Sequence, residues 1–302
     1  ILAKYHHEDC RGANTPALHG VHLAVDDCPD TDAEKALMAA KPFRQLLGSL
    51  RHLCDVSRPD LAHAVSAVSR FAHNPGPVHG TALQHILKYL KRFPDLCIVY
   101  GREREGIPFA PCHGYVDGSW GDCPDSRRSR TGYCFLAWGG CISWRSVRQQ
   151  STALSSCEAE YMAASESSKE SVWLRRLYSE DFGYDDLSIV TKGDLSESEY
   201  AGKQPMTVFE DNQSCIYLSR NPTSHKTSKH IAIRYHFTRE LVQQGIIKLV
   251  KIGTKLNLAD ILTKPCSKAT FTFLRDRLMS PREGIRVQGP VGVQDPVTAV
   301  AV

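Results

Sequence analysis

Four acidic residues stand at positions where their residue type calls for an explanation. Asp117 lies inside the predicted strand 114–120, and Asp211 follows the apolar run 206–209 where a helix is predicted to begin. Glu158 and Asp260 fall in the first turns of two further predicted helices. Because Asp is disfavoured inside strands, and strand ends and helix starts of an α/β sheet can meet at one place, we expect these carboxylates to converge.

Carboxylates brought together repel one another unless cations neutralise them, and oxygen ligands suit Mg²⁺, with Mn²⁺ as a substitute. Two such ions about 3.5–4 Å apart form a known arrangement for cleaving phosphodiesters. We therefore predict a two-ion Mg²⁺ site at which the four acids are both metal ligands and catalytic residues.

Each acid also has a structural explanation. Asp117 could open an Asx turn, and Glu158 completes the capping box that Ser155 begins. Asp211 could cap the helix that follows it, and Asp260 could complement a helix dipole. Taken singly these explanations compete with the metal site, but all four acids in this order favour the site.

The elements that must position these acids alternate over residues 110–270. Apolar runs predict strands at 114–120, 130–138, 141–147, 206–209 and 246–252, with a tight turn at Gly139-Gly140. Helical spacing predicts helices at 156–178, from 212, at 231–244 and from 257. This order predicts an α/β fold with a mixed sheet flanked by helices.

The remaining regions differ in composition. Apolar residues at helical spacing over 41–105 predict a small helical subdomain before the sheet. We expect a linker or weakly ordered segment over 1–40, a polar insertion over 185–203 and a disordered tail over 281–302. Since the chain begins with Ile1 in mid-pattern, we expect it to be a fragment of a longer protein or a trimmed gene model.

Overall composition narrows the class of protein. The 302 residues are 42% hydrophobic and 23% charged, which allows a packed core, and the net charge of +4 does not by itself indicate a nucleic-acid-binding protein. The 11 cysteines include no CxxC pair, so a reduced intracellular protein is favoured over a disulfide-bonded one. The compartment is left as cytoplasmic or nuclear. No signal peptide or membrane-spanning run is evident, and no membrane partner is expected.

Several motifs together resemble the C-terminal part of the Pol polyprotein of copia-type LTR retrotransposons. They include Gly114-Tyr-Val-Asp-Gly-Ser-Trp120, Ala153-Leu-Ser-Ser-Cys-Glu-Ala-Glu-Tyr-Met-Ala163, Glu210-Asp-Asn-Gln-Ser214 and Ala259-Asp-Ile-Leu-Thr-Lys264. Upstream, Phe43-Arg-Gln-Leu-Leu-Gly-Ser-Leu50 and Ser57-Arg-Pro-Asp-Leu-Ala62 resemble the tail of that family's reverse transcriptase. The resemblance covers roughly residues 1–270.

The resemblance implies a ribonuclease H-like five-stranded fold over 110–270 that degrades RNA in RNA–DNA hybrids during reverse transcription. It implies that Asp117, Glu158, Asp211 and Asp260 bind the metal, and that Glu160 faces the helix flank. The expected partners are an RNA–DNA hybrid and the polymerase portion of a Pol polyprotein; the oligomeric state is left open. The resemblance also implies that a cytoplasmic location would be a virus-like particle. The family's Tyr-x-Asp-Asp polymerase motif does not occur in this sequence, so we expect no polymerase active site here.

Basic residues suggest where the substrate binds. No acidic residue occurs between Ser126 and Cys157, whereas five arginines do, and a second basic cluster lies between the third and fourth acids. We predict a phosphate track from these residues, although the first group could instead be a solvated edge hairpin. The predicted contacts are Arg127, Arg128, Arg130, Arg145, Arg148, Lys226, Lys229 and Arg234. His230 is a candidate for assisting the leaving group, and Tyr115, Trp120 and Trp144 are expected to pack in the core rather than stack on bases.

Two function classes follow. The leading prediction is a two-metal ribonuclease H acting on hybrids, and the alternative is a silent, decayed or co-opted remnant that binds nucleic acid or a protein partner. A transposase or integrase on the same fold is disfavoured, since such sites generally use three acids.

Overall fold

The computed structural model describes residues 1–18, 20–178, 205–221 and 229–282, with the backbone alone described for 229–235. Its main sheet has five strands in the order β4-β3-β2-β5-β6. β2 pairs antiparallel with β3, and β3 with β4, whereas β2–β5 and β5–β6 are parallel. The predicted ribonuclease H-like mixed sheet is confirmed. The strands are β2 (His113–Ser119), β3 (Arg130–Ala137), β4 (Gly140–Arg148), β5 (Met206–Glu210) and β6 (Ile247–Lys251).

The hairpin between β3 and β4 shows how local sequence sets the sheet. Ala137 pairs with Gly140, which leaves a two-residue turn at Trp138 and Gly139. Both turn residues have positive φ, 49° and 78°, as a type I′ turn requires. The twist of this turn matches the twist of the two strands, so the predicted tight turn is confirmed, one residue earlier than expected.

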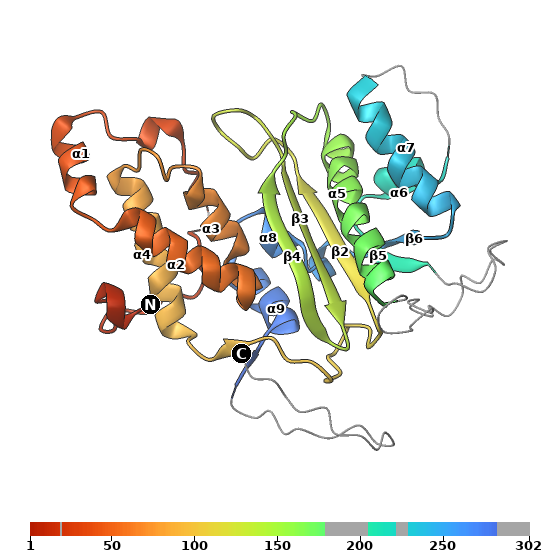
Figure 1. Cartoon of the computed structure of the whole chain (residues 1–302), viewed down its shortest axis with the longest axis horizontal. Helices are drawn as coiled ribbons and strands as arrows, with labels where there is room; N and C mark the ends of the chain where they lie inside the picture. Colours follow the sequence, from red (N-terminus) through yellow and green to blue (C-terminus); the bar gives the residue numbers. More distant parts are fainter. Residues whose placement is uncertain (19, 179–204, 222–228, 283–302) are drawn as a thin grey trace.

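Helices cover both faces of the sheet (Figure 1). Side chains alternate along β3: Tyr133 and Phe135 join one core cluster, whereas Cys134 and Leu136 join the other. The first cluster lies beneath α5 (Ser156–Arg176) and α6 (Gln213–Arg220), with α7 (Lys229–Gln243) packed outside them. The second lies beneath the N-terminal helices together with α8 (Asp260–Thr263) and α9 (Lys268–Leu278).

The N-terminal helices form the predicted helical subdomain, and it shares its core with the sheet. Its helices are α1 (Asp32–Ala39), α2 (Phe43–Val56), α3 (Ala62–Ser69) and α4 (Pro77–Arg92), with short 3₁₀ turns at Ala3–Tyr5, Val25–Asp27 and Pro59–Leu61. One continuous cluster joins leucines of α2 and α4 to Leu136 of β3 and Leu262 of α8. The subdomain therefore buries one face of the sheet.

Several elements were not predicted. Helix α1 lies inside the segment expected to be weakly ordered, and the capping box of Thr31 and Glu34 stabilises its start. Helix α9, the 3₁₀ turn Thr254–Leu256 and the small sheet of β1 (Leu96–Cys97) and β7 (Ser280–Pro281) were also missed. Within the part of the chain that the structure describes, no helix has the length and apolar character needed to cross a bilayer.

A buried ion pair ties the subdomain together. The Arg58 guanidinium donates two hydrogen bonds to the Asp60 carboxylate, at 2.9 and 2.8 Å, and the Tyr89 hydroxyl donates a third at 2.7 Å. The side chains of Arg58 and Asp60 are almost completely buried. Removing one partner would leave an uncompensated charge in the core.

We therefore predict that Asp60→Ala lowers the free energy of unfolding by about 3–5 kcal/mol, measured by chemical denaturation. The control is Asp55→Ala, which removes a 2.7 Å ion pair with Arg51 whose two side chains are half exposed. That exposed pair contributes less than about 1 kcal/mol. Equal losses in the two variants would contradict this reading of the buried pair.

Candidate metal centre

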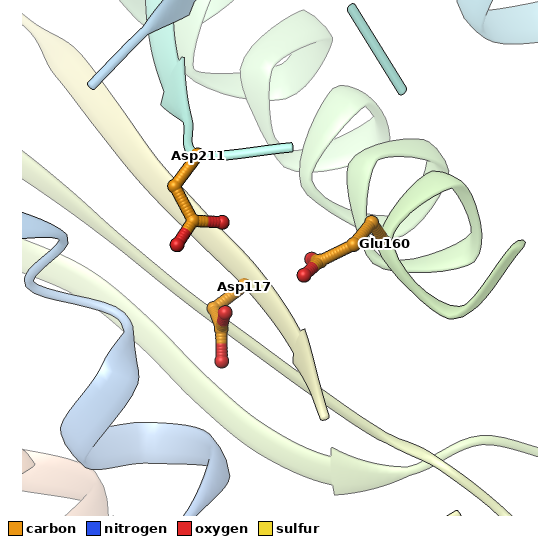
Figure 2. Close-up of side chains that lie close together, drawn as sticks. All are labelled: Asp117, Glu160 and Asp211. Carbon is orange, nitrogen blue, oxygen red and sulfur yellow. The ribbon is translucent and has the colours of Figure 1, made fainter. Parts of the chain in front are cut away.

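Three carboxylates meet at one end of the main sheet. One oxygen each of Asp117, Glu160 and Asp211 lies within 4.8 Å of the other two (Figure 2). Asp117 comes from β2, Asp211 directly follows β5, and Glu160 comes from the second turn of α5. Asp117 and Glu160 are buried, with 3% and 8% of their surface exposed, and Asp211 is half-buried.

Parallel pairing brings the two aspartates together. The parallel pairing of β2 with β5 runs to Tyr115 and Phe209, and each of these residues is followed two positions later by an aspartate. Because parallel strands end at the same edge of a sheet, Asp117 and Asp211 arrive at one place from distant parts of the sequence. The expected convergence of these two residues is observed.

A glycine allows the third carboxylate to reach the strand. Gly118 lies against α5, and a Cβ there would come within 2.6 Å of the Ala159 carbonyl oxygen. The Gly118 N–H donates a 2.5 Å hydrogen bond to Glu160 Oε2. The close approach of helix to strand therefore holds the Glu160 carboxylate beside Asp117.

The structure brings a different glutamate from the predicted one into the cluster. Glu160, expected on the helix flank, is in the cluster, whereas Glu158 lies outside this group of three. Glu158 Oε2 accepts a 2.8 Å hydrogen bond from the Leu154 N–H, and its own N–H donates to the Ser155 hydroxyl. Residues two positions apart on an α-helix point about 200° apart, so Glu158 and Glu160 cannot both face β2. Glu158 therefore has hydrogen bonds at the start of α5, although its carboxylate accepts from Leu154 rather than from the N-cap residue Ser155 as a capping box requires.

Asp260 lies beside the cluster rather than in it. Lys264 Nζ is 3.0 Å from Asp260 Oδ1 and 4.0 Å from Asp117 Oδ2. The Thr263 hydroxyl also donates a hydrogen bond to Asp117 Oδ2. Helix α8 therefore presents an acid, a hydroxyl and an ammonium group to the side chain of Asp117.

Burial and the charges of neighbouring carboxylates raise the pKa of Glu160, Asp260 and Asp117. Burial, then the charges of Glu210 and Asp117, raise the pKa of Glu160 to about 11. Burial, then Asp117, raises the pKa of Asp260 to about 6. Burial also raises the pKa of Asp117. A divalent cation would relieve this repulsion, and the all-oxygen donor set fits Mg²⁺ or Mn²⁺.

Sequence reasoning missed a further acid, Glu210, the last residue of β5. It is fully buried, and burial raises its pKa well above the usual value. Its Oε1 accepts from the Asn212 N–H, and its Oε2 has no hydrogen-bond partner among the described residues. The sequence signal that could have identified Glu210 is its place as an acid at the end of a buried strand, next to Asp211. The helix after it is capped by Asn212, so the capping explanation for Asp211 does not apply.

The predicted phosphate track is only partly at the surface. Arg127 and Arg145 are exposed and Arg128 is half-buried, but Arg130 is buried and donates to Ser66 and Ser146 while pairing with Asp122. These partners hold the Arg130 side chain inside the structure, away from the surface where a phosphate contact was predicted. The half-buried Arg148 donates to the Cys123 sulfur.

The second basic cluster falls largely where side chains are not described. Lys226 lies outside the described residues. Lys229, His230 and Arg234 belong to the first turns of α7, and their side chains lie outside the described set as well. Their assignments therefore stay predictions.

Of the three aromatic residues expected in the core, one is at the surface. Tyr115 is buried, and the half-buried Trp144 packs on the shared core and donates to the Cys54 carbonyl. Trp120 is 55% exposed, so the expectation for it was wrong. Its indole N–H donates a 3.0 Å hydrogen bond to the Ala153 carbonyl, which fixes the ring beside the loop that leads into α5.

Comparisons with known proteins identify relatives that match most of the chain, although no family model matches it. The chain is 37% identical over 276 residues, 91% of its length, to the retrovirus-related Pol polyprotein from transposon TNT 1-94 of Nicotiana tabacum, and it spans 19% of that protein. It is 45% identical over 133 residues to secreted RxLR effector protein 161 of Plasmopara viticola, matching 44% of this chain and 91% of that protein. Ribonuclease H1 from Halobacterium salinarum NRC-1 matches 50% of this chain and 93% of its own at 17% identity, with a TM-score of 0.32.

The raised pKa of Asp260 gives a testable pH dependence in the metal-free protein. Its folded pKa of about 6 exceeds its usual 3.8, so the folded state holds the proton more tightly than the unfolded state. Stability from this group is present below pH 4 and is lost as the pH rises through 6, by up to about 3 kcal/mol. We expect wild type in EDTA to lose more stability than Asp260→Asn between pH 4 and 7, measured by denaturant unfolding. Parallel pH profiles of the two proteins would contradict it.

Proposed function

Because the chain belongs to the family of retrovirus-related Pol polyproteins of copia-type transposons, we propose that it is a ribonuclease H that hydrolyses the RNA strand of RNA–DNA hybrids with Mg²⁺. The observation that carries the proposal is the convergence of Asp117, Glu160 and Asp211 within 4.8 Å. The chain spans about a fifth of the tobacco relative, so the polymerase portion of such a polyprotein is proposed as a partner.

Bound divalent ions would supply Lewis-acid stabilisation of the cleaved phosphate and a more acidic water molecule. Neighbouring groups of the chain orient the carboxylates that would bind the ions. The Gly118 N–H fixes the Glu160 carboxylate, and the Thr263 hydroxyl fixes that of Asp117. Asp211, half-buried at the end of its strand, is the most accessible of the three to substrate.

The substrate is proposed to cross the surface next to this centre. The exposed Trp120 lies three residues after Asp117 on the same stretch of chain, and the Arg127 guanidinium lies near Gly121 in the following loop. An exposed indole beside an arginine suits a nucleic-acid strand, because sugars and bases can lie on the ring while the guanidinium contacts phosphate.

Cleavage of a labelled RNA–DNA hybrid with Mg²⁺ tests the proposal. We expect Asp117→Asn, Asp211→Asn and Glu160→Gln each to lower the rate by at least about 100-fold. The matched control is Glu158→Gln, two residues away on the same helix, which keeps an oxygen for the Leu154 N–H and should keep most of the activity.

Two outcomes would contradict this assignment. If Glu158→Gln abolishes cleavage while Glu160→Gln does not, the assignment of the glutamate is wrong. If wild type cuts the hybrid no faster than Asp117→Asn, the chain is a silent remnant, as in the alternative above.

Binding of the hybrid tests the surface separately. In an Asp117→Asn background, which prevents cutting, Arg127→Ala should weaken binding and lower the slope of log K against log salt by about 1. The control is Arg130→Ala, which removes a buried arginine and should lower thermal stability while leaving the salt slope unchanged. A salt slope that changes with Arg130 but not with Arg127 would contradict the proposed path.

A further inference from the structure

Lys264 lies at the metal centre, although nothing in the pattern of acids called for a cation from the chain itself. Its Nζ is 3.0 Å from Asp260 Oδ1 and 4.0 Å from Asp117 Oδ2. The side chains of these two acids are only 7% and 4% exposed, whereas that of Lys264 is 43% exposed. The ammonium group therefore enters from the solvent side and lies between two buried carboxylates.

The backbone holds Lys264 in this position. Its N–H donates to the Asp260 carbonyl at 3.2 Å, which closes the single turn of α8. Its own backbone is extended, with φ −144° and ψ 154°, as expected of a residue that precedes proline, here Pro265. Asp260 and Lys264 are thus four residues apart on a turn whose exit is fixed.

The two cation positions share one residue. Asp117 belongs to the cluster with Glu160 and Asp211, and it also contacts Lys264 together with Asp260. If only carboxylates surrounded Asp117, one ion could bind between Asp117, Glu160 and Asp211 and a second between Asp117 and Asp260. In this chain the position between Asp117 and Asp260 already holds the Lys264 ammonium group.

We propose that the Lys264 ammonium occupies the second cation position of the centre, between Asp117 and Asp260, so that the substrate-free chain binds one divalent ion tightly rather than two. The inference rests on the proposed function, because it assumes that these acids bind divalent ions. A second ion would have to displace the ammonium group, and its affinity is therefore set by Lys264.

The structure offers a place for the displaced side chain. Lys264 and Pro265 line a cavity of about 130 Å³ that is also lined by α3, α4 and the loop after β2. Asp122 lies in the same lining, and its Oδ1 is buried with no hydrogen-bond partner among the described residues, while its Oδ2 pairs with Arg130. The wall of the cavity that Lys264 lines thus also carries a carboxylate oxygen that could accept from a displaced ammonium group.

Counting bound Mn²⁺ on the full chain tests the inference. Electron paramagnetic resonance titration of metal-free wild type should give one tight ion and a second at least about tenfold weaker, a free-energy difference of about 1.4 kcal/mol. In Lys264→Met the second ion should bind at least about tenfold more tightly, and in Lys264→Arg it should remain weak. The control, Lys268→Met, changes an exposed lysine at the start of α9 and should titrate like wild type.

Thermal unfolding gives a readout independent of ion counting. In EDTA, Lys264→Met should melt below wild type because Asp117 and Asp260 lose their counter-charge, and Mn²⁺ should raise its melting temperature more than that of wild type. Lys264→Gln provides a second uncharged variant if the methionine variant does not fold.

The outcomes separate this inference from the proposed function. Two equally tight ions in wild type, or unchanged Mn²⁺ binding in both uncharged variants, would overturn the role of Lys264 whether or not the hybrid is cut. A wild-type chain that binds one tight Mn²⁺ but cuts no hybrid would refute the proposed function and leave the role of Lys264 standing.

Discussion

Repulsion among buried carboxylates is the constraint to which the rest of the centre responds. Two full charges 4.8 Å apart repel by about 3.5 kcal/mol at an effective dielectric constant of about 20, and this cost recurs for each pair in the cluster. The carboxylates stay close together despite this repulsion because the β2–β5 pairing and the contact of α5 with Gly118 fix the backbone positions from which they extend. Retained protons, the Lys264 ammonium and a bound cation are three ways of relieving it.

The two glutamates of α5, Glu158 and Glu160, differ in their hydrogen-bond partners. Glu158 helps to order the start of α5, because its Oε2 accepts from the Leu154 N–H and its own N–H donates to the Ser155 hydroxyl, while its Oε1 has no hydrogen-bond partner among the described residues. Glu160 receives one backbone N–H and otherwise faces other carboxylates. An acid whose surroundings are mainly other acids is poorly explained by folding alone, and for that reason the cluster carries the functional argument.

Much of the fold was predictable because its signals are local. Strand alternation, the Gly139-Gly140 turn and the helical spacing of leucines each act over a few residues, and the observed strands begin and end within about two residues of the predicted ones. Asp117 was predictable because Asp is disfavoured inside a strand, and Asp211 because it follows the end of one. The errors came from contacts between distant elements. The position of the Glu160 carboxylate depends on which face of α5 packs against Gly118, and the burial of Arg130 depends on its hydrogen bond to Ser66 of α3.

Arg130 also shows why the helical subdomain belongs with the metal centre. It joins Ser66 of α3, Ser146 of β4 and Asp122 of the loop after β2. Asp122 in turn lines the cavity that Lys264 borders, and Lys264 contacts Asp117. A shift of α3 against the sheet would therefore move Arg130, loosen Asp122 and alter the surroundings of the ammonium group. The packing of the subdomain on the sheet thus shapes the cavity beside Lys264.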